Sequence, residues 1–401
     1  MKIRPIILCG GAGTRLWPNL KNSQAKQFIN FGGWNLLAKT LDRVKGSIFD
    51  YPIISTNLKY LKKVRIYLKK SGIKKYKIIL EPAKKNTAPA ILSSALIKDI
   101  PDKQPLIFLS ADHLIEKTGS FNNEIKKNKK HLTDKNIFIF GIKPNMPSDQ
   151  FGYFMTKKYK KNLNKVTKFL EKPNSSKANK IIKKGGYWNS GMFFIRKDSV
   201  INNFKKYQKN MYRYSLKSIN KSKTKNNICY LNKNAFIKNQ SKSFDFAILE
   251  KIKNINAIKL NINWSDLGSW REILLMYNNN KKKYFNKKNI FYRPWGKYTN
   301  LFNGNNFLIK EIYVKPKGTL SLQKHFHRSE HWVVTQGIPR ITLNKKLILR
   351  KPKETIFIPQ GAIHRIHNPS KKPVKIMEAQ LGSILKETDI VRYKDIYGRV
   401  N

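Results

Sequence analysis

The sequence predicts an α/β domain with a doubly wound, mostly parallel sheet, followed by an all-β domain. Over the first two thirds of the chain, short apolar segments alternate with amphipathic helical segments, which is typical of repeated strand–helix units. The last third holds only short apolar segments separated by turn residues, a pattern of all-β domains. At 401 residues the chain is also long enough for two hydrophobic cores.

Buried strands are expected in the first part of the chain wherever branched and aromatic residues form short runs. These runs are residues 3–9, 52–55, 77–80, 106–110, 137–141 and 192–195. Helices are expected between them, over 36–44, 58–71 and 88–100. Ligands of such sheets bind outside the carboxyl ends of the strands, so a site is expected in the segments that follow the strands.

A segment rich in Asn and Lys divides the chain. It shows no apolar period and is expected to be a linker, which gives a first domain over 1–280, a linker over 281–292 and a second domain over 293–401. Strands of the second domain are expected at 307–314, 332–335, 340–343, 355–358 and 374–378. Short strands with regular turns indicate a small barrel or sandwich.

Charge is the extreme feature of the composition. The chain has 82 Lys and Arg against 23 Asp and Glu, a net charge of +59, and 68 of the 82 cations are Lys. Such a surplus suits a protein that binds nucleic acid or an anionic membrane. Lys, Asn and Ile are enriched along the whole chain, however, and no nucleic-acid module is recognisable. We therefore expect no specific nucleic-acid partner, and a basic nucleic-acid-binding protein stays as the alternative from another class.

The cysteine count and the apolar runs bear on the compartment. Cys9 and Cys229 are too few for a disulfide framework, which favours a reducing compartment, the cytoplasm. No apolar run approaches the roughly 20 residues of a membrane span. The apolar start of the chain is broken at Gly10, so we expect a first strand there instead of a leader peptide.

Two polar segments in the first domain carry chemistry. Glycines from Gly10 onward allow backbone N–H groups to approach a phosphate, with Arg15 and Lys26 nearby as cations; the alternative is a tight turn. Asp112 ends a buried strand, where a carboxylate either binds Mg²⁺ or caps the next helix. Asp266 is a second acid that could complete such a metal site.

Several motifs occur together in one order along the first domain. They are residues 10–18, 26–28, 81–82, 86–90, 111–113, 151–153, 169–173, 188–193 and 264–270. The series is similar to the mannose-1-phosphate guanylyltransferases of the sugar nucleotidyltransferase family, over roughly residues 3 to 275. The resemblance implies a Rossmann-like nucleotide-binding fold. It also implies transfer of GMP from GTP to mannose 1-phosphate, giving GDP-mannose and pyrophosphate for polysaccharide synthesis.

This resemblance also implies roles for individual residues. The residues expected at the triphosphate are Gly10, Gly11, Gly13, Thr14, Arg15 and Lys26. Those expected to hold Mg²⁺ are Asp112 and Asp266, while Lys172 would meet the sugar phosphate. Gly152, Glu171 and Asn189 would read the mannose, and further substrate contacts are expected from Glu81, Asn86 and Thr87.

Histidines cluster in the second domain, where five of the seven lie between residues 325 and 367. Such a cluster points to a metal or acid–base site. The expected metal ligands are Gln323, His325, Glu330 and His364, a mixed set that suits Zn²⁺, Mn²⁺ or Fe²⁺. Residues 323, 325 and 327 alternate and are expected on one face of a strand. The alternative is a set of exposed strand histidines.

The spacing of these histidines, with Gln323 and Glu330, resembles that of the cupins, whose fold is a double-stranded β-helix. The longer segment 320–332, with residues 389–392 and 397–399, is similar to the type II phosphomannose isomerase domain. The resemblance implies interconversion of fructose 6-phosphate and mannose 6-phosphate through an enediol. His327 is the expected base, while Arg392 and Arg399 are expected to bind phosphate or stabilise the enediolate. A transferase with an inactive cupin is the alternative.

Two departures from this family pattern concern the second half of the chain. Only about twenty residues separate Trp270 from Arg293, whereas family members usually carry several further strands there. That segment bears on subunit contacts, and a homodimer is the assembly we expect. Lys386 and Thr388 stand where the family usually has Gly and Asp, next to Arg392.

Overall fold

The computed structural model describes residues 1–11, 25–29, 31, 34–160, 163–268, 272–273, 289–304 and 306–398. Two compact units divide the chain, and the first of them ends at Asp266. Each unit has its own sheets and its own core, and they are described in turn. Among the described residues, no helix combines the length and the apolar character that crossing a membrane requires.

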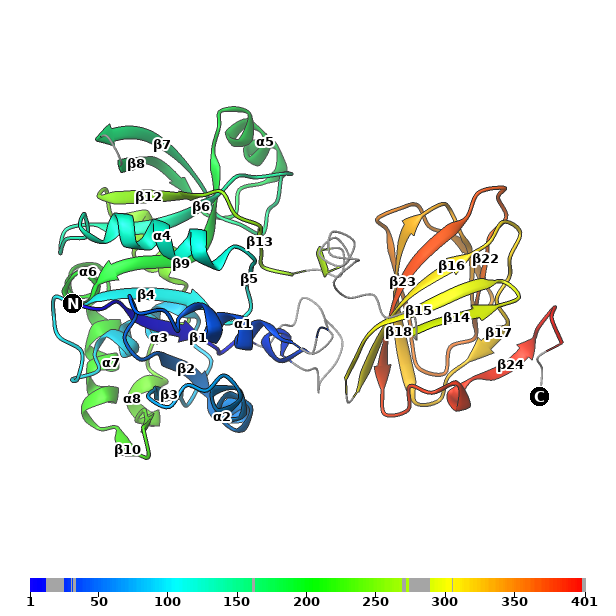
Figure 1. Cartoon of the computed structure of the whole chain (residues 1–401), viewed down its shortest axis with the longest axis horizontal. Helices are drawn as coiled ribbons and strands as arrows, with labels where there is room; N and C mark the ends of the chain where they lie inside the picture. Colours follow the sequence, from blue (N-terminus) through cyan, green and yellow to red (C-terminus); the bar gives the residue numbers. More distant parts are fainter. Residues whose placement is uncertain are drawn as a thin grey trace. The chain divides into compact units, whose positions relative to one another are not determined.

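A large mixed sheet organises the first unit, in the order β10-β11-β3-β2-β1-β4-β9-β6-β12-β8-β7. Its parallel centre, visible in Figure 1, consists of β1 (Arg4–Leu8), β2 (Ile53–Asn57), β3 (Lys77–Glu81) and β4 (Pro105–Ser110). These four strands and β6 (Ile137–Ile142) lie where the apolar runs predict them.

The sheet is less parallel than expected, because β9 (Tyr187–Arg196) is antiparallel to both of its neighbours β4 and β6. Its apolar run predicts a buried strand, and the strand is there. A strand buried on both faces is a continuous apolar run in either direction, so its composition does not reveal its direction.

Other strands carry weaker sequence signals. The last two strands of the sheet order, β8 (Leu163–Leu170) and the terminal β7 (Tyr153–Lys160), are interrupted by lysines, which are common near sheet edges. The remaining strands of this unit are β5 (Leu114–Ile115), β10 (Lys223–Lys225), β11 (Ile228–Tyr230), β12 (Ile255–Leu260) and β13 (Trp264–Ser265). β5 and β13 pair with each other outside the large sheet.

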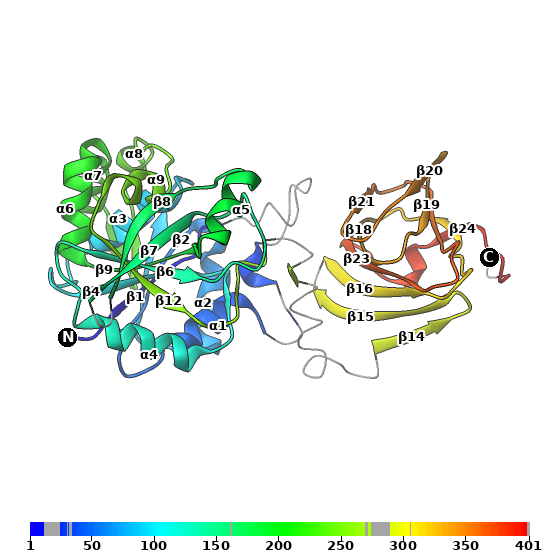
Figure 2. The same ribbon diagram turned by 90° about the horizontal axis from the view of Figure 1, so that it is seen from above.

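Helices cover both faces of the sheet, as Figure 2 shows. One face carries α1 (Leu36–Arg43), α2 (Leu61–Lys70) and α4 (Thr118–Lys129). The other carries α3 (Thr87–Ala95), α6 (Lys197–Tyr207), α7 (Lys209–Asn220), α8 (Lys233–Phe236) and α9 (Phe244–Ala247). The further helices are α5 (Ser175–Lys183), η1 (Lys26–Phe28), η2 (Leu58–Tyr60) and η3 (Leu249–Lys251).

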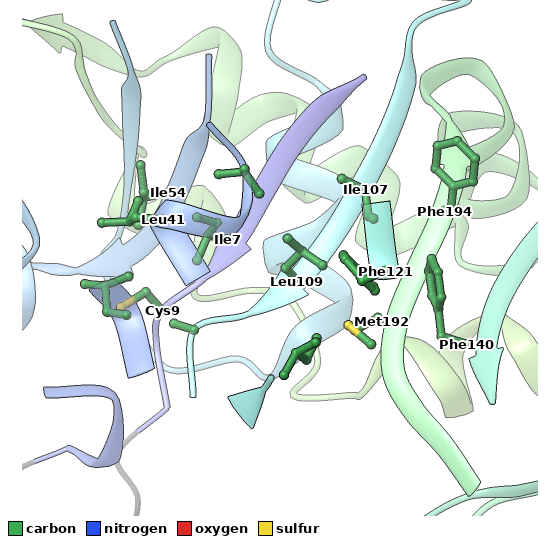
Figure 3. Packing of buried hydrophobic residues seen from close by; sticks show 14 of the residues in the cluster. Ile7, Cys9, Leu41, Ile54, Ile107, Leu109, Phe121, Phe140, Met192 and Phe194 are labelled. Atoms are coloured by element: carbon green, nitrogen blue, oxygen red, sulfur yellow. The ribbon is translucent and has the colours of Figure 1, made fainter. Parts of the chain in front are cut away.

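Alternate side chains of the strands supply the two cores on the two faces. On β1, Ile7 belongs to the cluster beneath α1, α2 and α4, whereas Ile6 belongs to the cluster beneath α3 and α6. Figure 3 shows Ile7, Leu41 and Phe121 within the first cluster. Burial on both faces explains why the central strands are apolar throughout, and it fixes the strand ends that carry the site.

The second unit consists of two antiparallel sheets, which confirms the predicted all-β class. One sheet has the order β14 (Ile290–Arg293), β15 (Gly296–Gly304), β16 (Phe307–Val314), β23 (Val374–Gly382), β18 (Arg328–Gln336) and β21 (Thr355–Ile358). The other has the order β20 (Lys346–Leu349), β19 (Arg340–Leu343), β22 (His364–His367), β17 (Leu322–Lys324) and β24 (Val391–Lys394). A core that contains Trp332, Ile376 and Ile366 lies between them.

The segment between the units lies largely outside the described residues, which resume at Asn289. Strand β14 already begins at Ile290, three residues before the predicted start of the second domain. The boundaries 1–280, 281–292 and 293–401 stay a prediction.

Candidate functional site

A cavity of about 590 Å³ opens in the first unit at the carboxyl ends of β1, β3 and β4. This is the edge of the sheet where ligands of such folds bind. Its lining includes the predicted site residues Gly10, Gly11, Glu81, Asn86, Thr87 and Asp112. The predicted residues Gly13, Thr14 and Arg15 lie outside the described residues.

Lys26 connects Asp112, which lines this cavity, with Asp266. It lies in η1 and is almost fully buried. Its Nζ is 3.0 Å from Oδ2 of Asp112 and also donates to the backbone carbonyl of Asp266. Three residues that the sequence predicts to act together, more than 80 positions apart in each case, are therefore side by side.

Asp112 is held in its charged form. Burial alone raises its pKa, but the ammonium of Lys26, His113 and the hydroxyl of Ser110 together bring the pKa below its ordinary value. An ionised carboxylate is the oxygen ligand that Mg²⁺ prefers. Asp112 thus fits the predicted metal role, and the buried Asp266 lies next to it around Lys26.

A second group of predicted residues converges beside this cavity. The backbone N–H of Asn189 donates to the carbonyl of Gly152 at 2.7 Å. A Cβ on Gly152 would collide with Oε2 of Glu171, so the carboxylate lies directly against the glycine backbone. The three residues predicted to read the mannose form one cluster.

Asp245 joins this cluster, although nothing in the sequence singled it out. Its Oδ1 accepts a 2.7 Å hydrogen bond from Nδ2 of Asn189, and it lines the 590 Å³ cavity. Burial, followed by the charge of Asp245, raises the pKa of Glu171 to about 7, against an opposing effect of Lys172. Burial likewise raises the pKa of Asp245 to about 6.

Aromatic rings pack against one another near these residues. Phe151 packs between Trp188 and Trp264, with ring centroids 4.9 and 5.5 Å apart, and His113 meets Trp264 edge-on at 5.2 Å.

Lys172 is exposed and adopts a left-handed φ of 46°. A side-chain-bearing residue held in this conformation is uncommon and is often found at functional sites.

The second unit brings together three of its four predicted metal ligands. His325, Glu330 and His364 are buried, and their ligand atoms lie within 4.8 Å of one another. Nε2 of His325 is 3.1 Å from Oε1 of Glu330, and Nε2 of His364 is 3.6 Å from Oε2. The fourth predicted ligand, Gln323, is paired with His364 across β17 and β22.

Hydrogen bonds orient both imidazoles for a cation. Nδ1 of His325 faces the carbonyl of Asp389 at 3.1 Å, and Nδ1 of His364 faces that of Ala362 at 2.9 Å. A carbonyl only accepts, so a proton on each Nδ1 satisfies this contact, and in that tautomer each Nε2 would be left to coordinate an ion beside Glu330. Nε2 of His364 is buried without a hydrogen-bond partner. This donor set fits a divalent transition metal.

His327 does not face the same pocket as His325, contrary to the prediction. Strand β17 ends at Lys324, so the expected alternation of side chains does not continue to residue 327. The His327 side chain is 51% exposed and its Nδ1 contacts Oδ1 of Asp389 at 2.8 Å. His367 lies apart from the three clustered ligands and contacts the Thr319 hydroxyl.

A narrow cavity of about 60 Å³ lies beside the metal-ligand cluster. Gln323, Glu330 and the predicted Arg392 line it, while Arg399 lies outside the described residues. Its other charged and polar lining residues include Arg293, Tyr298, Lys310, Arg328, Glu378 and Glu387. Sequence reasoning missed these residues, because their positions along the chain show no common spacing.

Glu378 is a second perturbed carboxyl in this cavity, beside Glu330. Trp332 Nε1 donates to both Glu330 Oε2 and Glu378 Oε2, at 2.9 and 3.0 Å, and so draws the two acids together. Burial, with the nearby charge of Glu330, raises the pKa of Glu378 to about 8. The pKa of Glu330 is shifted in the other direction. Burial raises it, but His325, His364 and Arg328 bring it well below the ordinary value.

Family models match both parts of the chain. Residues 4–283 match the nucleotidyl transferase family and residues 279–395 match the mannose-6-phosphate isomerase C-terminal domain. The xanthan biosynthesis protein XanB of Xanthomonas campestris pv. campestris is 31% identical, with 99% of each chain covered. A mannose-1-phosphate guanylyltransferase of Escherichia coli K12 is 29% identical, covering 100% of this chain and 99% of its own.

A solved structure is similar as well. The crystal structure of a mannose-6-phosphate isomerase from Helicobacter pylori is 28% identical with a TM-score of 0.58, covering 66% of this chain and 100% of that chain. The alignment with XanB runs over 464 residues, more than the 401 of this chain, so that relative has residues without a counterpart here. The chain belongs to the nucleotidyl transferase family, and it shares with these full-length relatives a mannose-6-phosphate isomerase C-terminal domain.

Proposed function

We propose that the first unit transfers GMP from GTP to mannose 1-phosphate, giving GDP-mannose and pyrophosphate for polysaccharide synthesis. The names of the full-length relatives support this reaction. The observation that carries it is the Lys26 ammonium, which lies between Asp112 and Asp266 at the cavity lined by Gly10 and Gly11. A cation at this place, together with acids that can hold Mg²⁺, is what positioning a triphosphate requires.

In this reaction a phosphate oxygen of mannose 1-phosphate attacks the α-phosphorus of GTP in line, and pyrophosphate leaves. The chain has little covalent work to do beyond holding both substrates in that alignment. Asp112 and Asp266 would hold Mg²⁺, which neutralises phosphate charge when bound. We assign Arg15, Gly13 and Thr14 to the triphosphate, Glu81, Asn86 and Thr87 to the nucleotide, and Lys172 to the sugar phosphate.

The test is formation of GDP-mannose by the full chain supplied with GTP, mannose 1-phosphate and Mg²⁺. We expect Asp112→Asn to lower kcat on the order of 100-fold, because it removes an ionised ligand of the Mg²⁺ that would neutralise phosphate charge. Asp102→Asn is the matched control, since Asp102 is an exposed partner of Lys197 remote from the cavity. Replacing GTP by ATP, CTP or UTP tests the guanine preference. Failure of the unaltered chain to make GDP-mannose would reject the proposal.

We further propose that the second unit interconverts fructose 6-phosphate and mannose 6-phosphate. The buried cluster of His325, Glu330 and His364 supports this activity, as does the matching isomerase domain. With Gln323, these residues would hold Zn²⁺, Mn²⁺ or Fe²⁺, which polarises the sugar oxygens when bound. His325→Ala should abolish isomerisation and leave GDP-mannose formation intact. If the unaltered chain forms GDP-mannose but does not isomerise either sugar phosphate, the cupin is inactive.

We propose the cytoplasm as the site of action and a homodimer as the assembly. Cys9 and Cys229 are both buried and unpaired, which suits a reducing compartment. Leu347 and Leu349 are exposed on the edge strand β20 and offer an apolar face for self-association. Light scattering of the purified chain tests the dimer, and a monomeric mass at micromolar concentration would reject it.

A further inference from the structure

The narrow cavity of the second unit ends in a carboxylate surrounded by donors. Oε1 of Glu387 is 2.5 Å from Nη2 of Arg293 and accepts a 2.9 Å hydrogen bond from the hydroxyl of Tyr298. Arg293 lies on β14, Tyr298 on β15, and Glu387 on the short helix η5 (Glu387–Asp389). Three separate elements thus converge on one anionic group.

Two further cations lie at the same end of the cavity. Nζ of Lys310 lies 4.8 Å from the centre of the Tyr298 ring, and the guanidinium of Arg293 lies 5.3 Å from it. Arg392, on β24, lines the cavity too, and its Nε is buried without a hydrogen-bond partner. Lys310 is itself 3.8 Å from Oε1 of Glu378, so beyond the pair of Arg293 and Glu387 it is the charge of Arg392 that leaves the subsite capacity for a larger anion.

The metal-ligand cluster contributes to the same cavity. Glu330, which belongs to that cluster, lines the same cavity as Arg293 and Arg392. A ligand with a reacting carbonyl or hydroxyl pair at one end and a phosphate at the other would therefore meet suitable partners at both ends. Arginine is the side chain best matched to a phosphate group, since its planar fork donates two parallel hydrogen bonds.

We propose that Arg293, Tyr298 and Arg392 form the phosphate subsite for a sugar phosphate, and that Glu387 fills this subsite until the phosphate displaces it. Glu387 suits that role because its side chain is 49% exposed and lies on a helix of three residues. An exposed ion pair of this kind is weakly held, and a phosphate has more charge and more acceptor oxygens than a carboxylate. The inference rests on the proposed isomerase activity.

Arg293→Gln and Glu387→Gln test the proposal in opposite directions. Arg293→Gln removes a phosphate donor and should raise both the KM for mannose 6-phosphate and the inhibition constant of inorganic phosphate about tenfold, with a smaller effect on kcat. Glu387→Gln removes the internal competitor and should lower both constants several-fold. GDP-mannose formation should be unchanged in both variants.

Arg350→Gln is the matched control. Arg350 lies in the same unit, is not part of the cavity lining, and donates only to the carbonyls of Leu349 and Thr355. If Arg293→Gln has the same KM for mannose 6-phosphate and the same phosphate inhibition constant as this control, the proposed subsite is rejected, even where isomerisation continues. If Arg293→Gln does not fold, an unchanged phosphate inhibition constant in Glu387→Gln alone rejects the proposal.

Calorimetric titration with mannose 6-phosphate separates this inference from the isomerase itself. If the unaltered chain binds mannose 6-phosphate without turnover, and Arg293→Gln loses this binding, the subsite is supported and the isomerase activity is rejected. Turnover with an Arg293→Gln KM equal to that of the unaltered chain refutes the subsite and keeps the isomerase. An unaltered chain that neither binds nor turns over mannose 6-phosphate rejects both.

Discussion

At the scale of single residues, the pair Glu171 and Asp245 makes a pH dependence that no single carboxyl would show. Burial raises the pKa values to about 7 and about 6, and each charge opposes ionisation of the other. Near neutrality the pair holds a proton, so it can donate to one sugar hydroxyl and accept from another. We expect the KM for mannose 1-phosphate to rise as the pH passes through 7, where this proton is lost.

Asp245→Asn should move that transition to lower pH, because it removes a charge that raises the pKa of Glu171. The matched control is Asp149→Asn, an exposed acid that contacts only Gln150 among the hydrogen bonds described here. Steady-state kinetics between pH 5 and 9 provide the measurement. A transition at the same pH in both variants would show that the two acids act separately.

The raised pKa values of Glu171 and Asp245 also make the folding stability of the first unit depend on pH. An acid whose folded-state pKa is raised binds more protons in the folded than in the unfolded chain between its two pKa values. Stability of the first unit should therefore fall as the pH rises from about 4.5, the ordinary value for Glu, to about 7. Denaturant titrations across this range should show a smaller fall in Asp245→Asn, and an equal fall would contradict the coupling.

Sequence reasoning found some of these residues and missed others for a clear physical reason. Gly152, Glu171 and Asn189 lie in segments with recognisable motifs, and the fold brings them together. Asp245 contacts Asn189 although they are 56 positions apart, and Arg293 contacts Glu387 although they are 94 apart. Such pairs arise from tertiary packing, and no local spacing indicates them.

At the scale of elements, apolar runs predict where strands lie but not how the strands are connected. The central strands β1 to β4 are buried on both faces and stand out as continuous runs. The direction of β9 depends on the route of the chain between strands, which composition does not encode. Strands β7 and β8 were missed because their lysines conceal the period of two that marks a half-buried strand.

One side chain ties several elements of the second unit together. Asn368 is fully buried, and its Nδ2 lies within hydrogen-bond distance of the carbonyls of Val314, Lys315 and Lys372. These carbonyls lie at the end of β16 and before β23. Asn368→Ala would leave them without this donor, at a cost of about 1–3 kcal/mol for each buried group that stays unsatisfied.

We therefore expect Asn368→Ala to lower the free energy of unfolding of the second unit by roughly 3 kcal/mol. Asn306→Ala is the matched control, because Asn306 is exposed and its described hydrogen bond uses only the backbone carbonyl. Chemical denaturation followed by tryptophan fluorescence measures both variants. A loss no greater than that of the control would show that water replaces the amide at these carbonyls.

At the scale of the whole molecule, the net charge of +59 has two parts that act differently. A few cations lie where phosphorylated substrates are expected, among them Lys26 at the first cavity and Arg392 at the second. Most lysines lie elsewhere, such as Lys205 and Lys206 in the last turn of α6. Distant charges attract anionic substrates through solvent, and salt screens that attraction beyond about 8–10 Å.

Varying the salt concentration should therefore distinguish the cations at the substrate sites from the distant surface lysines. We expect kcat/KM for GTP with mannose 1-phosphate to fall several-fold between 50 and 500 mM KCl, with kcat nearly constant, since screening slows encounter but not chemistry. The double variant K205Q/K206Q should show the same fall from a slightly lower start, because it removes two of many distant charges. A nucleic-acid-binding protein would instead lose affinity for DNA or RNA steeply over this range. If kcat/KM does not change with salt while kcat falls, the surface charge contributes nothing to substrate capture, and the lysines serve only solubility.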